Sequence, residues 1–365
     1  MGEQSPGDTM VAIVLGTRPE IIKLSPLVHE CERQNIDFIV IHTGQHYSDS
    51  LDTVFFEQLE VPTPDYNLGV GSGSHGKQTG EMLINIEKVL LEEMPDIMVV
   101  QGDTNSALAG AVAASKTECQ LAHVEAGLRS FDRDMPEETN RVLADHVSDF
   151  LFAPTEQSRD YLLDEGRPDK DIYVTGNTIV DALYRHRELA RKKSNVFSEL
   201  GITDEEYFLM TAHRAENVDN ESRFRKLLSG VANTAAEHDV SVLYPAHPRA
   251  QERIEDFDID LSDRIRLTQS QDYLDFLRLE AGARLILTDS GGVQEEACVL
   301  QVPCVTLRDN TERPETVEVG ANRLSGVDPE MVQQAASEML SKPPKWENPF
   351  GSGETARKIL DVVIQ

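Results

Sequence analysis

Short apolar runs alternate with longer amphipathic stretches along most of this chain. In the first half, the runs are Met10–Leu15, Phe38–His42, Ile97–Gln101, Leu121–Val124, Phe150–Ala153 and Ile172–Thr175. Runs rich in Val, Ile and Leu are typical of strands buried on both faces, and the stretches between them have the apolar spacing of helices. Strands that alternate with helices form parallel sheets, so the pattern predicts an α/β fold.

A second series of strands begins after a basic, polar segment. This segment, Arg185–Ser194, is the best candidate for an interdomain linker or hinge. The later strands are predicted at Tyr207–Ala212, Val240–Pro245, Arg264–Thr268, Arg284–Thr288 and Pro303–Leu307. The predicted architecture is two open α/β sheets that face each other across a cleft. We expect one domain at residues 1–185, a second at residues 200–350, and a helix within residues 351–365 that can dock on either domain.

The residues after the first strand indicate an anion site. Gly-Thr-Arg-Pro-Glu occupies residues 16–20, and Thr17 with Glu20 has the spacing of a capping box, which predicts that a helix begins here. Arg18 then lies beside the unpaired N–H groups of the first turn, and Lys23 adds a second positive charge one turn later. This arrangement attracts a negatively charged ligand. The alternative is an ordinary cap with a solvated arginine.

The net charge excludes several kinds of partner. Asp and Glu number 64 against 34 Lys and Arg, which gives a formal charge of −30. This charge repels nucleic acids and anionic membranes, and no apolar run is long enough to cross a bilayer. A phosphate-bearing ligand therefore requires a few cations gathered at one site. The acidic excess also suits a salt-rich cytoplasm, where screening removes the self-repulsion.

Neither a metal nor a cofactor is predicted. The cysteines are scattered, without a Cys-x-x-Cys pair, at Cys31, Cys119, Cys298 and Cys304. Buried free thiols and a polar N-terminus without a secretory signal indicate a cytoplasmic protein. Gly71-x-Gly73-x-x-Gly76 has the spacing of a dinucleotide fingerprint but does not follow the first strand, so we expect a loop there.

Polar residues directly after the strands of the first half are candidates for a site, because ligands of open α/β sheets bind at the carboxyl ends of strands. These candidates are Arg18, Gln45, His46, Asp103, His123 and Glu125. Asp103 precedes an Ala-rich helix and has the alternative role of an N-cap. His123 and Glu125 are expected on one side of their strand, as site residues or as a satisfied buried pair. Glu137 and Glu138 lie in a first helical turn, where the helix dipole accounts for one of them.

The second half has the pattern of a nucleotide site, in which His213 again follows a strand. Ser290-Gly291-Gly292 opens a helix with bare backbone N–H groups and a hydroxyl, which suits a pyrophosphate. Glu296, inside that helix, suits the hydroxyls of a ribose, and Phe276 can stack on a base. Arg308 and Arg313 add cations. The alternatives are a helix cap, a solvated carboxylate and a core aromatic.

Seven motifs follow one another along nearly the whole chain. They are Gly-Thr-Arg-Pro-Glu at 16–20, Gly-Asp-Thr at 102–104, His-Val-Glu-Ala-Gly-Leu-Arg at 123–129, Pro-Glu-Glu-x-Asn-Arg at 136–141, Thr-Gly-Asn-Thr at 175–178, Thr-Asp-Ser-Gly-Gly-x-Gln-Glu-Glu at 288–296 and Glu-Arg-Pro-Glu at 312–315. Together they resemble the non-hydrolysing UDP-N-acetylglucosamine 2-epimerases. The resemblance implies two facing Rossmann-like domains in the glycosyltransferase-B arrangement. It also implies an isomerase that interconverts UDP-N-acetylglucosamine and UDP-N-acetylmannosamine through a 2-acetamidoglucal intermediate.

The resemblance assigns roles to individual residues. It implies an acid/base set consisting of Asp103, Glu125 and Glu137. It implies that UDP and the substrate are bound by Arg18, Lys23, His213, Phe276, Ser290, Gly291, Gly292, Glu296 and Arg313. Some relatives have a second, activating substrate site, to which Gln45, His46 and Gln78 would correspond. A homodimer is implied as well, and the elimination needs no redox cofactor.

Other activities fit parts of the pattern. A hydrolysing epimerase releases free N-acetylmannosamine with UDP. Another relative acts on UDP-2,3-diacetamido-2,3-dideoxyglucuronic acid, whose sugar carboxylate requires one more cation near the acids. A glycosyltransferase on the same fold binds UDP in the same way but does not need three acids around sugar carbon 2. A non-catalytic nucleotide-sugar sensor is the remaining alternative.

Overall fold

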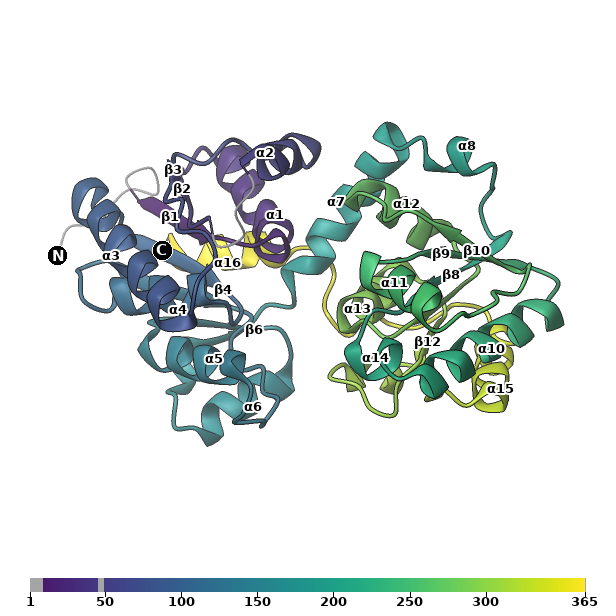
Figure 1. Cartoon of the computed structure of the whole chain (residues 1–365). Coiled ribbons are helices and arrows are strands. Elements are labelled where there is room, and N and C mark those ends of the chain that lie inside the picture. Colours follow the sequence, from purple (N-terminus) through teal and green to yellow (C-terminus); the bar gives the residue numbers. More distant parts are fainter. Residues whose placement is uncertain (1–8, 45–48, 365) are drawn as a thin grey trace. The chain divides into compact units, whose positions relative to one another are not determined.

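The chain divides into two compact units, each with its own sheet (Figure 1). The computed structural model describes residues 9–44 and 49–364, with the side chains of residues 49–53 excepted. The first unit runs to Tyr184 and resumes at Phe350, and the second comprises Arg185–Pro349. Each unit buries an apolar core of its own.

The first unit contains a parallel sheet with the strand order β3-β2-β1-β4-β5-β6-β7. Its strands are β1 (Met10–Leu15), β2 (Asp37–His42), β3 (Tyr66–Asn67), β4 (Ile97–Gln101), β5 (Gln120–Val124), β6 (Phe150–Ala153) and β7 (Ile172–Val174). Its helices are α1 (Arg18–Gln34), α2 (Asp49–Gln58), α3 (His75–Glu93), α4 (Asn105–Ala114), α5 (Pro136–Val147), α6 (Glu156–Asp164), the 3₁₀ helix η1 (Asp169–Asp171) and α16 (Thr355–Val363). This strand order is that of Rossmann folds.

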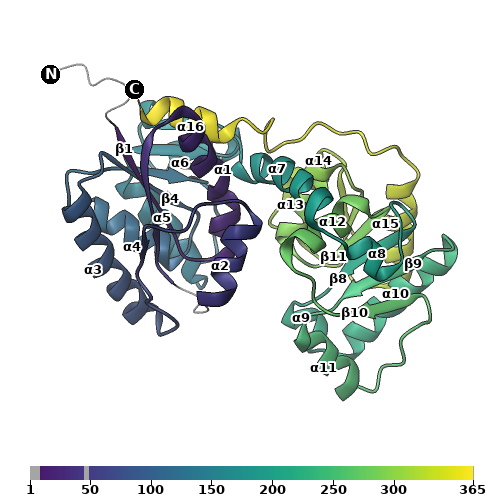
Figure 2. The same cartoon turned by 90° about the horizontal axis from the view of Figure 1, so that it is seen from above.

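The main core of the first unit lies between one face of this sheet and helices α3, α4 and α5. Small side chains on α4 allow a close approach to the sheet, since a Cβ on Gly110 would lie 2.8 Å from a methyl of Val100. Helix α16 packs against α1, although the two helices lie at opposite ends of the sequence (Figure 2).

The second unit repeats the arrangement, with the strand order β10-β9-β8-β11-β12-β13. Its strands are β8 (Tyr207–Thr211), β9 (Ser241–Pro245), β10 (Ile265–Thr268), β11 (Leu285–Thr288), β12 (Cys304–Thr306) and β13 (Asn322–Leu324). Its helices are α8 (Val196–Leu200), α9 (Ala215–Val218), α10 (Glu221–Glu237), α11 (Pro248–Asp256), α12 (Tyr273–Gly282), α13 (Gly291–Leu300), α14 (Pro314–Glu318) and α15 (Pro329–Leu340). Helices α10 and α15 cover the large apolar core, and α12 packs against α13.

The fold class expected from the sequence, α/β with two Rossmann-like parallel sheets, is confirmed. Each expected strand is present, with bounds that differ by a residue at most at either end. The pattern did not predict β3 or β13, which are edge strands of two and three residues. Strands this short have too few positions to show a period, and their place at the edge depends on pairing with β2 and β12.

The segment expected as a linker or hinge is largely helical. Residues 185–193 continue helix α7 (Thr178–Lys193), and the boundary between the two units falls inside this helix. The alternation of polar and apolar residues along the segment is therefore that of a helix surface rather than of an open loop. The C-terminal helix, whose docking the sequence left open, belongs to the first unit.

Gly16, directly after β1, is required by close packing. A Cβ at this position would lie 2.0 Å from Thr43 Oγ1 and 2.2 Å from Ser106 Oγ, two hydroxyl oxygens that are themselves hydrogen-bonded at 2.8 Å. Gly16→Ala is therefore expected to lower the free energy of unfolding by about 1–3 kcal/mol, because the overlap forces side chains apart in a packed site. Urea unfolding followed by circular dichroism measures this loss.

Gly80→Ala is the matched control. Gly80 lies inside α3, and a Cβ there would meet nothing within 4 Å. This substitution should leave stability unchanged or raise it by up to about 1 kcal/mol, because alanine is the better helix former. Equal destabilisation by both substitutions would contradict the packing explanation.

Candidate active site

Glu125 lies at the carboxyl edge of the first sheet, directly after β5, and is 6% exposed. Lys23 Nζ lies 2.6 Å and Asn177 Nδ2 2.7 Å from its Oε1 oxygen, and Gln101 Nε2 donates to Oε2. These donors come from α1, the residue before α7 and the last residue of β4. The backbone of Glu125 is left-handed, with a φ of 67°, which is costly for a residue with a side chain and typical of functional positions.

Asp103 follows β4 on the neighbouring loop, where Arg141 of α5 contacts its carboxylate. The N-cap of α4 is Thr104, whose hydroxyl accepts from the Ala107 N–H at 3.0 Å, so Asp103 is not the cap. Asn140 Nδ2 donates to the backbone carbonyl of Asp103 at 2.9 Å. The loop is thus held from α5, and the half-buried carboxylate of Asp103 is available for another role.

Of the two acids that open α5, the structure gives Glu138 the structural role. Its carboxylate accepts from the N–H and hydroxyl of Ser130 and from the Phe131 N–H, and it pairs with Arg141. Burial opposes the charge of Glu138, but these bonds outweigh it and lower its pKa. Glu137 is half-buried, and no hydrogen bond or ion pair engages its side chain within the described part of the chain.

The β1–α1 junction differs in part from the predicted capping box. Helix α1 begins at Arg18 as expected, but the side chain of Thr17 makes no cap hydrogen bond. Instead, Glu20 accepts from the Gly16 N–H at 3.0 Å, from the Thr17 hydroxyl at 2.8 Å and from the Thr104 hydroxyl at 2.6 Å. The bond to Thr104 ties this junction to the Asp103 loop. Burial raises the pKa of Glu20 to about 7, although the hydrogen bonds oppose the shift.

Arg18 is exposed, and its guanidinium lies over the ring of Phe55, 5.7 Å from the centroid. It is therefore accessible to a ligand at the first turn of α1. Lys23, expected to face an anion, pairs instead with Glu125.

His123 belongs to a buried charge network in which its ring nitrogens contact Asp145 and Gly102. It is thus a satisfied buried residue, but its partner is not Glu125, with which the sequence had offered a buried pair. The Nδ1 of His123 lies 2.7 Å from Asp145 Oδ1 and its Nε2 lies 2.8 Å from the Gly102 carbonyl oxygen. Arg129 pairs with the other oxygen of Asp145 at 2.7 Å and continues to Glu165. Burial opposes the charges of His123 and Asp145, but their mutual attraction outweighs it, so the pKa of His123 is raised and that of Asp145 is lowered.

The second unit gathers candidates around a buried aspartate. Asp289, after β11, accepts from the backbone N–H groups of His213 and Arg214 at 3.0–3.2 Å and from Asn217 Nδ2 at 3.1 Å. His213 Nδ1 lies 3.2 Å from Asp289 Oδ1, while 49% of the His213 side chain is exposed. Burial opposes the charge of Asp289, but the bonds from His213 and its neighbours hold its pKa below the usual range. Asp289 therefore orients the imidazole of His213.

Three of the predicted residues line one pocket of about 240 Å³: His213, Phe276 and Ser290. Its wall is completed by neighbouring segments that include His247, Gln271 and Val293. The mixture of an aromatic ring, two imidazoles and polar side chains suits a heterocyclic base with hydrogen-bonding edges.

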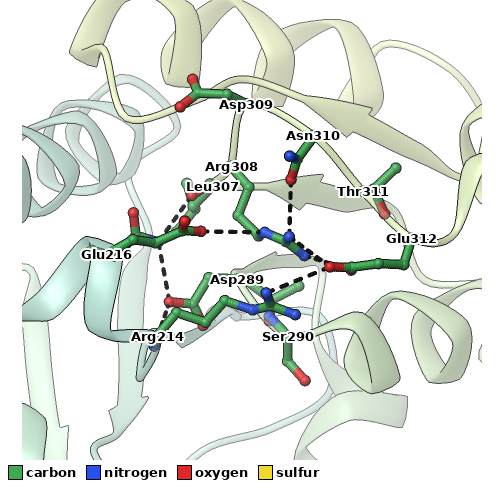
Figure 3. A network of polar contacts seen from close by, with 12 residues as sticks. Arg214, Glu216, Asp289, Ser290, Leu307, Arg308, Asp309, Asn310, Thr311 and Glu312 are labelled. Carbon is green, nitrogen blue, oxygen red and sulfur yellow. Dashed lines mark hydrogen bonds and ion pairs between the residues drawn. The ribbon is translucent and has the colours of Figure 1, made fainter. Parts of the chain in front are cut away.

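The N-terminus of α13 is formed by Ser290, Gly291 and Gly292, and a carboxylate lies beside it. A Cβ on Gly291 would lie 3.7 Å from Glu312 Oε2. Figure 3 shows that Arg308, which is buried, extends between Glu216, Asn310 and Glu312. Arg308 binds Glu312 through two N–H donors, at 2.7 and 2.8 Å, and lowers the pKa of Glu312 to about 2. Arg214 Nη1 lies 3.5 Å from the same carboxylate, so two cations flank this end of the helix.

The remaining predicted residues have clear positions. Glu296 is half-buried on α13, and Arg313 pairs with Glu295 at 2.6 Å. Gln78 is buried, donates to the Gly71 carbonyl at 2.7 Å and accepts from Asn105. Gln45 and His46 lie outside the described residues.

Sequence reasoning did not single out Gln101 and Asn177 as partners of Glu125, nor Asp145 and His247. Asn177 was visible within Thr-Gly-Asn-Thr after β7, and its neighbour Gly176 has a φ of 92°. The polar residue after a strand was thus a usable signal.

Across residues 9–44 and 49–364, no group of three or more His, Cys, Asp or Glu side chains is arranged to hold a metal ion. Within the same residues, no helix has the length and apolar character to span a membrane.

The sequence matches the protein family described as UDP-N-acetylglucosamine 2-epimerase over residues 29–364. It is 54% identical over 359 residues to the UDP-N-acetylglucosamine 2-epimerase of Methanocaldococcus jannaschii, covering 97% of this chain and 98% of that protein. It is 39% identical over 359 residues to the UDP-2,3-diacetamido-2,3-dideoxy-D-glucuronate 2-epimerase of Pseudomonas aeruginosa, covering 97% and 99%.

Solved structures resemble the chain over nearly its full length. The crystal structure of the M. jannaschii enzyme in complex with UDP-GlcNAc and UDP has a TM-score of 0.83 and 53% identity, covering 97% of this chain and 99% of that one. The Neisseria meningitidis UDP-GlcNAc 2-epimerase bound to UDP-GlcNAc has a TM-score of 0.85 and 32% identity, covering 98% and 100%.

Proposed function

Because the chain belongs to the UDP-N-acetylglucosamine 2-epimerase family, we propose that it interconverts UDP-N-acetylglucosamine and UDP-N-acetylmannosamine by eliminating UDP and adding it back. The resemblance seen in the ordered motifs is confirmed by the match over residues 29–364 and by the 54% identity to the M. jannaschii enzyme. The observation that carries the proposal is the carboxylate of Glu125, held at a sheet edge by Lys23 and Asn177. Such a group is a positioned acid or base.

Elimination requires a base and a stabilised leaving group. The hydrogen on sugar carbon 2 is not acidic, but breaking the C1–O bond gives carbon 1 oxocarbenium character, which acidifies it. The electron pair of the C1–O bond leaves with UDP, a carboxylate takes the C2 proton, and a C1–C2 double bond forms. Re-addition returns a proton to the other face of C2 while a UDP oxygen bonds to C1. Two faces require more than one acid or base.

We assign this acid/base work to Asp103, Glu125 and Glu137. The donors around Glu125 orient its carboxylate, and Arg141 orients that of Asp103. Glu137 is half-buried at the first turn of α5, where a proton can reach it from solvent. Lys23, paired with Glu125, acts near the reacting sugar and not as an isolated anion site.

We assign most of the contacts with UDP to the second unit. The pocket lined by His213, Phe276 and Ser290 takes the uracil end, and the backbone N–H groups of Gly291 and Gly292 bind the pyrophosphate. We assign the ribose hydroxyls to Glu296 as acceptor. Arg18 and Arg313 are the remaining cations of the proposed UDP set, and the activating role of Gln45, His46 and Gln78 stays a proposal.

The relative from P. aeruginosa favours a second candidate substrate, a UDP-diacetamido-uronic acid. A sugar carboxylate would need a cation that is not committed to an acid. Lys23 is bonded to Glu125, and Arg141 is bonded to Asp103 and Glu138. These pairings, with the higher identity to the M. jannaschii enzyme, favour UDP-N-acetylglucosamine.

Proton NMR in D2O tests the proposed function. The protein is incubated with UDP-N-acetylglucosamine, and we expect UDP-N-acetylmannosamine to appear with deuterium at sugar carbon 2. Free N-acetylmannosamine with UDP would show a hydrolysing epimerase instead. Unlabelled substrate after long incubation would reject epimerisation and leave the glycosyltransferase or sensor interpretations. Parallel incubation with the uronic acid substrate decides between the two sugars.

His213→Ala is expected to weaken UDP binding by roughly 2- to 10-fold, because a hydrogen bond to the uracil end of the ligand is lost. Isothermal titration calorimetry with UDP measures the change. His146→Ala, at an exposed site on α5, is the matched control and should leave UDP affinity unchanged. Undiminished affinity of His213→Ala would remove this residue from the UDP site.

We also propose a homodimer in a reducing cytoplasm. Large apolar side chains on α3 and at its C-cap are exposed, namely Ile84, Leu91 and Met94. An exposed apolar helix face is typical of a subunit interface. All four cysteines are free, as expected in a reducing compartment. Light scattering coupled to size-exclusion chromatography measures the mass, and a monomer at micromolar concentration would contradict the proposal.

A further inference from the structure

The loop between β7 and α7 supplies one of the donors that hold Glu125. Asn177, the residue before α7, is 2% exposed, and its Nδ2 donates to Glu125 Oε1 at 2.7 Å. The amide oxygen of Asn177 accepts from the Ile179 N–H at 3.0 Å, in the first turn of α7. Because the oxygen is engaged by the helix, the NH₂ end of the amide faces Glu125. The position of this loop therefore sets the position of the donor.

Residues 350–355, here called the return segment, bind this loop from the other end of the sequence. The chain re-enters the first unit at Phe350, whose carbonyl oxygen accepts from the Asn177 N–H at 2.8 Å. Thr355 is 1% exposed, and its hydroxyl donates to the carbonyl oxygens of Thr175 and Asn177, at 3.3 and 3.4 Å. Both backbone groups of Asn177 are thus bonded to the return segment.

The loop and the return segment approach more closely than side chains would allow. Gly176 has a φ of 92°, and a Cβ at this position would lie 2.8 Å from the Phe350 carbonyl oxygen and 3.0 Å from Thr355 Oγ1. Only glycine combines this backbone conformation with such an approach. The absence of a side chain at residue 176 therefore lets the two backbones bond directly.

The return segment is itself anchored to the first unit by α16. Asp181 of α7 accepts from the Ala356 N–H at 3.0 Å, which satisfies one of the N–H groups left unpaired in the first turn of α16. Helix α16 packs against α1, the helix that carries Lys23. Lys23 and Asn177 are the two donors to Glu125 Oε1. Both donors therefore belong to elements that the C-terminal part of the chain contacts.

We propose that Thr355 is a positioning residue for the acid/base group: together with the Phe350 carbonyl, it holds the loop so that Asn177 keeps the Glu125 carboxylate in its reacting orientation. The inference rests on the proposed function, because it takes Glu125 as an acid or base. Thr355 acts through Asn177 and not by contact with the substrate. A small displacement of a reacting group lowers the rate steeply, whereas most of the proposed contacts with UDP lie in the second unit and are unaffected.

Thr355→Val tests this role in the full-length protein, because it removes the hydroxyl and nearly keeps the shape of the side chain. We expect kcat and deuterium exchange at sugar carbon 2 to fall by roughly 5- to 50-fold. The KM and the Kd for UDP should change by no more than about twofold. Thr355→Ser restores the hydroxyl and should recover most of the lost rate. NMR measures exchange, and calorimetry measures UDP affinity.

Thr234→Val is the matched control. Thr234 is a fully buried residue of α10, in the second unit, and its hydroxyl donates to the Gly230 carbonyl oxygen at 2.8 Å. The control loses a buried hydroxyl bond of the same kind, so it should lose stability without losing kcat. Urea unfolding of both variants identifies a temperature at which both are folded, and the rates are compared there. If Thr355→Val does not fold, Thr355→Ala replaces it, since alanine adds no methyl group at the position of the hydroxyl.

The outcomes separate the inference from the proposed function. If the wild-type protein does not exchange deuterium at sugar carbon 2, the proposed function and this inference both fail. If it does, wild-type turnover by the variant without the hydroxyl overturns only the inference, as does a raised KM with an unchanged kcat. Equal slowing of Thr355→Ser, or of Thr234→Val, would also overturn it, because the loss would then not depend on the Thr355 hydroxyl.

Discussion

Glu125→Gln should abolish deuterium exchange at sugar carbon 2 while UDP still binds. The substitution keeps the size of the side chain but removes the negative charge that Lys23 and Asn177 face. A neutral amide cannot take a proton, and loss of a positioned acid or base costs roughly 10²- to 10⁴-fold in kcat. Because Glu125 belongs to the first unit and most contacts with UDP are assigned to the second, the Kd for UDP should change by no more than about threefold.

Glu118→Gln is the control for this change. Glu118 is exposed and precedes β5, at the end of the strand opposite Glu125. The same loss of charge there should leave exchange and turnover at wild-type rates. Rates of exchange are measured by NMR, and UDP affinity by calorimetry. Full turnover by Glu125→Gln would show that another group handles the proton.

Asp145→Asn should produce the largest loss of stability. Asp145 is fully buried between His123 and Arg129, at 2.7 Å from each. Removing its charge leaves two cationic groups buried without their common partner, which costs about 3–5 kcal/mol. His123 also holds the Gly102 carbonyl, so the Asp103 loop should loosen and activity should fall with stability. Thermal and urea unfolding measure the stability.

Asp164→Asn, at an exposed position of α6, is the control and should change the free energy of unfolding by no more than about 0.5 kcal/mol. A loss of less than about 1 kcal/mol in Asp145→Asn would show that this network adds little to the fold.

The pH dependence of this stability difference follows from the direction of each shift. The pKa of Asp145 is lowered in the fold from 3.8, so its contribution is present above that pH and is lost as the pH falls through the folded value. The pKa of His123 is raised from 6.5, so its contribution is complete below that pH and is lost as the pH rises through the folded value. The gap between wild type and Asp145→Asn should therefore be largest between pH 3.8 and 6.5. A gap that grew steadily towards alkaline pH would exclude a charged His123.

The order of elements was predictable because it depends on neighbouring residues. Each apolar run became a strand, and the residue after each strand was known before any contact was seen. Glu125 after β5 and Asp103 after β4 follow from this order alone, since parallel strands bring their carboxyl ends to one edge. The same logic placed His213 after β8 and Ser290 after β11.

The partners of these residues depended on segments that are distant in sequence. Glu125 is hydrogen-bonded to Lys23, which is 102 positions away in the sequence, and to Asn177, which is 52 positions away. Neither contact follows from local spacing. The same reason explains why His123 proved to be buried with Asp145, which lies on α5. The sequence by itself determined which chemical groups stand at the strand ends, whereas tertiary packing alone decided which of them are buried, paired and oriented, because burial and pairing depend on side chains from several elements at once.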